Sequence, residues 1–103
     1  MQQRSTQLKE VLPHIKIGLH ETDQVVLIID DYELFDFIDD YLTEECEISY
    51  EWWSSTERVG GEIITMCFSK AITIEQLESA LLKLSPEMIE SIYSLNNNAS
   101  LQE

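Results

Sequence analysis

Residues 25–42 read VVLIIDDYELFDFIDDYL, and this pattern predicts a strand followed at once by a helix. All five residues from Val25 to Ile29 are apolar, which is typical of a strand buried on both faces at the centre of a sheet. We expect Asp30 or Asp31 to cap the helix, with Glu33 completing a capping box. The apolar residues that follow recur at helical spacing and form one stripe of a helix from Asp31 to Thr43: Leu34, Phe35, Phe37, Ile38, Tyr41 and Leu42.

The segments before this stretch are expected to lead into the same sheet. A short helix is expected around Thr6–Leu12, where Pro13 interrupts the chain. Apolar and polar residues then alternate over residues 14–20, which predicts a half-buried strand. The polar residues Glu21–Gln24 connect it to the central strand as a hairpin.

Two further helices are expected near the C-terminus. Thr73 and Gln76 form a capping box that starts the first of them. Ser85 and Pro86 cap and start the second, because proline suits the first position of a helix. We expect Asn96–Asn98 to end this helix.

The order of elements predicts the α+β class. Cys46–Trp53 and Glu62–Phe68 read as two strands joined by a long polar loop over residues 54–61. The order is then ββαββαα, a two-layer sandwich with helices on one face of a four-stranded antiparallel sheet. This order matches a circularly permuted ferredoxin-like topology, as an analogy of element order alone. We expect one α+β domain over residues 1–95 and a disordered C-terminal tail over residues 96–103.

Composition indicates the cellular compartment in which the protein is expected. The longest uninterrupted apolar run, Val25–Ile29, is far below the roughly 20 residues needed to cross a bilayer. No apolar signal segment is visible over residues 1–7, and two cysteines are too few for a disulfide framework. We therefore expect a cytoplasmic protein without membrane association.

Charge is the strongest functional signal. The net charge is −14, from 6 Lys and Arg against 20 Asp and Glu. Glu21 to Glu62 holds fourteen acids and one base, Arg58. Such a field repels nucleic acid and anionic lipid and attracts basic surfaces. The alternative is that this acidity only keeps the protein soluble.

The acids gather on the expected helix and just after it. Asp39 and Asp40 lie toward its C-terminus, where the helix dipole disfavours negative charge. Acids at this unfavourable position suggest that their charge serves to bind a partner. The alternative is that they only form a solvated face of the helix. The acids concerned are Glu33, Asp36, Asp39, Asp40, Glu44, Glu45 and Glu47.

The neighbouring tryptophans are expected to point to opposite sides of a strand. Alternation places Trp52 with Ile48 and Tyr50, and Trp53 with Ser49 and Glu51. We expect Trp53 on the open face of the sheet, with His14, Lys16, His20, Val26 and Ile28. An open aromatic face indicates an association patch unless the last helix or the leader covers it.

No constellation of residues predicts catalysis, a metal site or a cofactor. His14 and His20 lie six residues apart on one expected strand, roughly 20 Å by strand rise, which is too far to share a metal. Cys46 and Cys67 lack a CxxC context and read as buried thiols. We therefore expect a protein that is not an enzyme.

Two functional hypotheses follow. The first is an acidic protein-interaction module, such as an immunity protein, an antitoxin or a nucleic-acid-mimicking inhibitor, that covers a basic protein. The alternative is a regulatory or ligand-binding domain that forms a homodimer through its open sheet face. The residues expected to bind the partner in the first case are Glu33, Asp36, Asp39, Asp40, Glu44, Glu45, Glu47, Glu51, Trp52 and Trp53.

Overall fold

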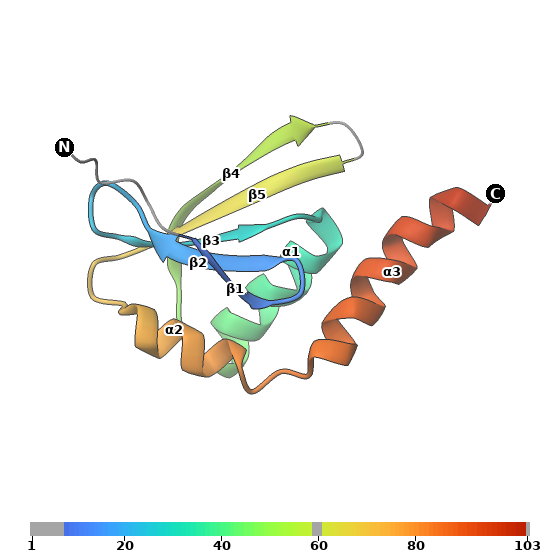
Figure 1. Cartoon of the computed structure of the whole chain (residues 1–103). Helices are drawn as coiled ribbons and strands as arrows, with labels where there is room; N and C mark the ends of the chain where they lie inside the picture. Colours follow the sequence, from blue (N-terminus) through green and yellow to red (C-terminus); the bar gives the residue numbers. More distant parts are fainter. Residues whose placement is uncertain (1–7, 59–60, 103) are drawn as a thin grey trace.

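The sheet has five strands, and the helices lie together on one side of it (Figure 1). A computed structural model of the chain describes residues 8–58 and 61–102. All neighbouring strands are antiparallel, in the order β1-β2-β3-β5-β4. The strands are β1 Lys9–Leu12, β2 Ile15–Leu19, β3 Val25–Ile29, β4 Tyr50–Arg58 and β5 Gly61–Phe68. The helices are α1 Tyr32–Asp40, its π-helical continuation η1 Tyr41–Glu45, α2 Ile74–Leu81 and α3 Pro86–Gln102.

The α+β class is confirmed, but the expected number of strands is wrong. Lys9–Leu12 forms the edge strand β1 instead of part of a short helix. Pro13 and His14 make a two-residue turn, in which His14 adopts a positive φ of 67°. This turn brings β1 back onto β2, with Lys9 opposite Ile17. A pairing of this kind supplies hydrogen bonds that an isolated helix of about two turns cannot match.

The core lies between one face of the sheet and the helices. β3 is central, as its apolar sequence predicted. The largest fully buried side chains come from the sheet and from α1, η1 and α2: Ile15, Ile17, Leu27, Ile29, Ile64, Met66, Phe68, Leu34, Ile38, Leu42, Leu77 and Leu81. The Tyr41 hydroxyl donates to the carbonyl of Ala80 at 2.7 Å and so connects η1 to the end of α2. Burial and then a hydrogen bond with Cys46 raise the pKa of Tyr41 to about 12, so the hydroxyl stays a donor.

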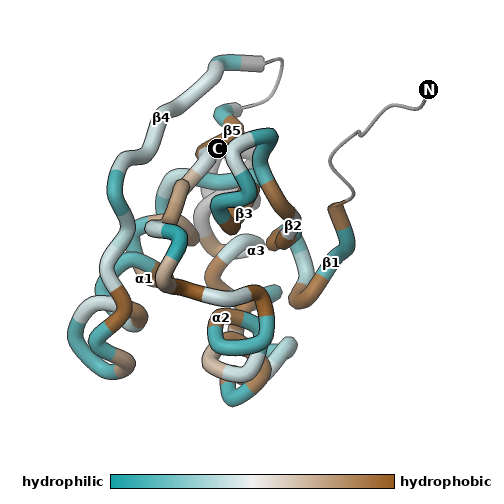
Figure 2. Tube along the Cα trace, turned by 90° about the vertical axis from the view of Figure 1, so that its left-hand side faces the viewer, coloured by the Kyte–Doolittle hydropathy of each residue, from teal (hydrophilic) through white to brown (hydrophobic). Residues whose placement is uncertain are grey.

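The hairpin of β4 and β5 replaces the long polar loop that the sequence predicted. β4 continues to Arg58 and β5 begins at Gly61, so residues 54–58 are paired and only residues 59–60, which lie outside the described part, separate the strands. Figure 2 shows β4 in white and teal, because serine, threonine and glutamate dominate its second half. Polar residues on both faces of an exposed edge strand leave no period-2 hydropathy signal.

The starts of the helices follow local chemistry closely. Asp31 caps α1, because its carboxylate accepts the Leu34 N–H at 3.0 Å. With Asp31 as the cap, Glu33 is not three residues further on, and the expected capping box with Glu33 is wrong. The box of Thr73 and Gln76 at α2 is confirmed.

Helix α3 starts as predicted and ends later than predicted. The Ser85 hydroxyl accepts the N–H groups of Glu87 and Met88. The helix then continues through Asn96–Asn98 to Gln102, so the expected stop at the asparagines is wrong. Asparagine is only a moderately poor helix former, and extending an existing helix is much easier than starting one. The disorder of a tail over residues 96–103 stays a prediction.

Candidate protein-interaction surface

Helix α1 presents its acids on the side opposite its buried stripe. Leu34, Phe35 and Ile38 face the core, so the helical period directs Asp36 and Asp40 outward. The helical segment continues through η1 to Glu45, which moves the unfavourable helix end from Asp39 and Asp40 to Glu44 and Glu45. The acids exposed here are Glu33, Asp36, Asp40, Glu44, Glu45 and Glu47.

Asp39 differs from the other acids because it is half-buried against β4. Burial is the main cause that raises its pKa above the usual range, and the charges of Asp40 and Asp36 add to it. The Tyr50 hydroxyl donates a hydrogen bond to this carboxylate, which partly lowers the pKa again. The pKa of Tyr50 is raised in turn, by burial and by the charge of Asp39. This contact joins the acidic helix to strand β4.

A cluster of aromatic rings lies beside Asp39 on the same side of the sheet. The ring centroids of Trp53 and Phe35 are 4.7 Å apart, and those of Trp53 and Tyr32 are 6.3 Å apart. Phe35 is buried, whereas Trp53 remains 39% exposed and Tyr32 46% exposed. Half-exposed aromatic rings fixed from beneath are the kind of anchor that protein interfaces favour.

A β-bulge in β4 decides which tryptophan joins the acids. Tyr50 is opposite Phe68 and Trp52 is opposite the next residue, Cys67, so the pairing shifts at Glu51. Tyr50 and Trp53 therefore face the helices, and Trp52 faces the other way. The expected placement of Trp53 on the open face is wrong, because simple alternation does not allow for the extra residue.

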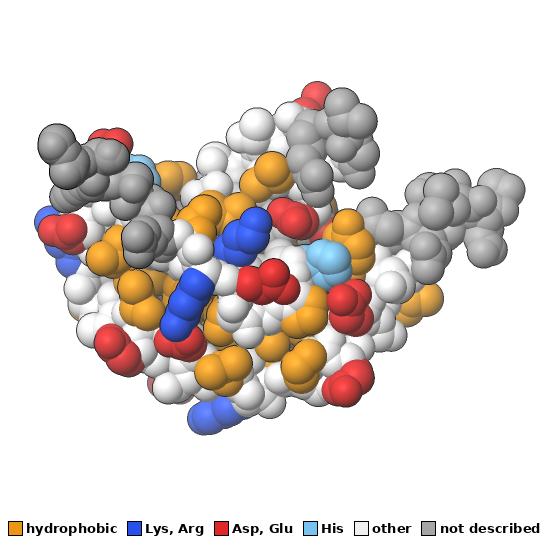
Figure 3. All heavy atoms as spheres, in the orientation of Figure 1, with side chains coloured by type: hydrophobic (Ala, Val, Ile, Leu, Met, Phe, Trp, Pro, Cys, Tyr) orange, Lys and Arg blue, Asp and Glu red, His pale blue; other side chains and the backbone are white. Residues whose placement is uncertain are grey.

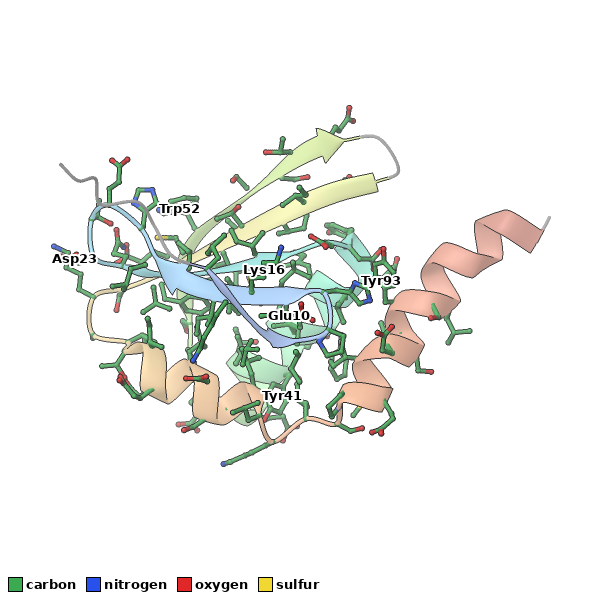
Figure 4. The ribbon with its side chains drawn as sticks, viewed as in Figure 1. Glu10, Lys16, Asp23, Tyr41, Trp52 and Tyr93 are labelled. Carbon is green, nitrogen blue, oxygen red and sulfur yellow. The ribbon has the colours of Figure 1, made fainter. Side chains whose placement is uncertain are left out.

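Trp52 and Glu51 form a separate group on the far side of the sheet. The Trp52 ring lies 6.4 Å from that of His20, edge to face. The amide of Gln24 donates to Glu51 at 2.9 Å and to the carbonyl of Phe68 at 3.0 Å. Figure 4 shows Trp52 and Tyr41 on opposite sides of the sheet. Ten residues are expected from the sequence to bind the partner together. Glu51 and Trp52 therefore lie apart from the other eight.

The open sheet face is less available than the sequence suggested. Val26 is 4% exposed and Cys67 is fully buried, although both lie on this face. Lys16 is on the same face, opposite Glu10 of β1. In Figure 3, which views the molecule from the side of β1 and β2, basic, acidic and hydrophobic side chains are intermixed. This side does not repeat the uniform acidity of α1.

His14 leaves the open face and contacts α3. Its ring stacks on Tyr93, with the centroids 3.6 Å apart, and its Nε2 lies 3.2 Å from Oε1 of Glu90. The positive φ of His14 turns the side chain out of the strand pattern. No sequence signal indicates this contact, because 76 residues separate His14 from Glu90.

Tyr32 belongs to the same surface as Trp53, although the sequence pattern does not predict it. It stands on the polar side of α1, outside the apolar stripe, and its partner Trp53 comes from a strand 21 positions later. Only the fold brings the two rings together. The feature of the sequence that could have indicated Tyr32 is an aromatic residue in the first turn of a helix, at a position that the buried stripe does not include.

No protein-family model matches this chain, and neither a curated protein nor a solved structure does. Within residues 8–58 and 61–102, no group of three or more His, Cys, Asp or Glu side chains is arranged to hold a metal ion. None of the helices in that part is long and apolar enough to span a membrane.

Proposed function

We propose that this protein is a small acidic interaction module, without enzymatic activity, that binds a basic protein. An immunity-type, antitoxin-type or nucleic-acid-mimicking inhibitor would have this character. The surface concerned is the outer side of α1 and η1 together with Trp53 and Tyr32; we call it the acidic-aromatic surface.

One observation carries the proposal: the half-exposed ring of Trp53 packs against Tyr32 and Phe35 of α1, the same helix that carries the exposed acids. An aromatic anchor supplies contact area, and the carboxylates supply orientation and a fast association rate with a cationic partner. Asp39 supports the same reading, because its charge is held half-buried among like charges at a cost to stability.

The test is capture of a partner from a cell lysate by two variants of equal net charge. The first carries Asp36→Asn, Asp39→Asn and Asp40→Asn, and it removes three charges from the acidic-aromatic surface. The control removes three exposed charges elsewhere in the chain: Glu10→Gln, Glu21→Gln and Glu75→Gln.

We expect the wild type and the control to retain a basic protein that high salt releases, and the α1 variant to lose it. Equal retention by both variants would show that only total charge matters and would contradict the proposal.

The homodimer through the open sheet face has weaker support. It needs Val26, Ile63 and Trp53 on that face as new contact area. Val26 is already covered within one chain and Trp53 lies on the other side, which leaves only the half-buried Ile63 of the three. Sedimentation at micromolar concentration tests it, and a dimer that breaks on Trp52→Ala would favour it over the acidic module.

A further inference from the structure

The two edges of the sheet are protected very differently. β1 has four residues, carries Lys9, is irregular between Glu10 and Leu12, and ends beside Pro13. Short length, lysine, bulges and proline are the means by which proteins prevent a sheet edge from pairing with another chain. Lys9 also forms an ion pair with Glu78 of α2 at 2.9 Å, so this edge is held against a helix.

Strand β4 forms the other edge and has less of this protection, with charged side chains only at Glu51, Glu57 and Arg58. It has nine residues, contains neither lysine nor proline, and has its bulge at one end, at Glu51. Among the described strands it pairs with β5 alone. Every residue from Glu51 to Glu57 is exposed. In an antiparallel ladder every second residue directs its N–H and C=O away from its partner, so β4 presents a row of unpaired backbone groups.

Charge decides between the two kinds of strand that could pair here. If β4 of a second copy paired antiparallel across a two-fold axis, both α1 helices would lie on the same face of the joined sheet. The joined sheet would then carry two acidic helices on the same face, and the repulsion between their like charges costs free energy. A strand with positive charge would instead lie next to Asp39, which is joined to β4 through Tyr50, and next to Glu57 of β4 itself.

We propose that β4 is a docking edge onto which an extended basic segment of a partner protein adds as a sixth strand. This inference rests on the proposed function and specifies how the partner is bound. Backbone hydrogen bonds to β4 supply the pairing. On the helix side, alternate side chains of the added strand lie beside Trp53 and the Tyr50–Asp39 pair, where lysine or arginine gains both ion pairing and a cation–π contact.

The experiment uses two synthetic peptides of equal charge. One is a capped heptapeptide of alternating lysine and valine; the other has the same sequence with N-methyl groups on alternate backbone nitrogens, so that it cannot complete a ladder. Amide hydrogen exchange of the full chain, followed by NMR, reports where each peptide binds. The amides of β1 serve as the internal control.

We expect the first peptide to slow exchange at alternate amides of Glu51–Glu57 and at none in β1. The methylated peptide should bind about tenfold more weakly or worse, because it loses several hydrogen bonds. Equal binding of both peptides would overturn strand addition while leaving charge-based binding, and so the proposed function, intact.

Two other outcomes would also overturn the inference. One is that neither peptide changes exchange in β4. The other is that β4 amides are already protected at high protein concentration without peptide, since a second copy of the chain would then occupy the edge. The proposed function would still be judged separately, by the capture experiment with the two triple variants.

Discussion

Asp39 is the residue at which stability and proposed binding oppose each other. Its pKa is raised by burial first and by Asp40 and Asp36 next, with Tyr50 offsetting part of the effect. The folded protein therefore holds a proton on this carboxyl more readily than the unfolded chain does. The stability that the protonated form provides is lost as the pH rises through the raised pKa, so at neutral pH the charge of Asp39 destabilises the fold.

Asp39→Asn should consequently stabilise the protein at pH 7, by about 0.5 kcal/mol, the size of unfavourable like-charge pairs on a helix. Urea unfolding at pH 7 and again below the ordinary Asp pKa measures this gain, which should shrink in acid because wild-type Asp39 is then protonated. Asp23→Asn, in the β2–β3 connection, is the control with the same change of charge. A loss of stability at pH 7 would contradict the assignment.

The cysteines offer a second test at single residues. Cys67 is fully buried, and burial first, then Glu51, raises the pKa of its thiol, whereas Cys46 is half-buried. Because the thiolate is the reactive form, Cys67 should react with iodoacetamide more than about tenfold more slowly than Cys46 in the folded protein. Mass spectrometry of the modified peptides measures both rates. The difference should disappear in urea, and its persistence there would show that the fold is not its cause.

At the scale of elements, α1 depends on a single cap. The sequence left Asp30 and Asp31 as equal alternatives, since both precede the helix. The structure selects Asp31, which is buried and accepts the Leu34 N–H. The position of the strand end decides the cap, because β3 ends at Ile29 and the chain needs one further residue before turning into the helix.

Asp31→Ala should therefore cost about 1 kcal/mol, a typical value for the loss of an N-cap carboxylate. Asp30→Ala removes the same charge one position earlier and serves as the matched control, with a much smaller effect. Denaturant unfolding of the two variants compares the losses directly. Equal losses would mean that the cap is shared or that charge alone is responsible.

Strand β4 shows what local pattern can miss. The polar composition of its second half predicts a loop, and uninterrupted alternation through Glu51 places its two tryptophans on the wrong sides of the sheet. The bulge that breaks the alternation is a property of the pairing with β5. The sequence therefore does not predict that Trp53 and Tyr32 lie together on the candidate surface.

At the scale of the whole molecule, the acids are both numerous and segregated. The net charge of −14 resides mostly between Glu21 and Glu62, and α1 gathers much of it on one side. Self-repulsion in such a distribution disfavours the compact state and is screened by salt.

Sodium chloride up to about 0.5 M should accordingly raise the urea midpoint of unfolding, since the Debye length falls well below the spacing of most surface charges. The α1 triple variant Asp36→Asn, Asp39→Asn, Asp40→Asn should respond less to salt than the control with Glu10→Gln, Glu21→Gln and Glu75→Gln. Circular dichroism at several salt concentrations measures each midpoint. An identical response would indicate that the charges on α1 do not repel one another more than charges elsewhere do.

The sequence alone determined the α+β class, the central strand β3, the buried stripe of α1, the capping box of α2 and the start of α3. Each of these depends on residues within a few positions of one another, where hydrophobic period and capping chemistry act directly. Tertiary structure decided the fifth strand, the length of β4, the bulge at Glu51 and the meeting of Trp53 with Tyr32. Those features depend on hydrogen bonds and side-chain packing between segments far apart in the chain, whose partners no local pattern specifies.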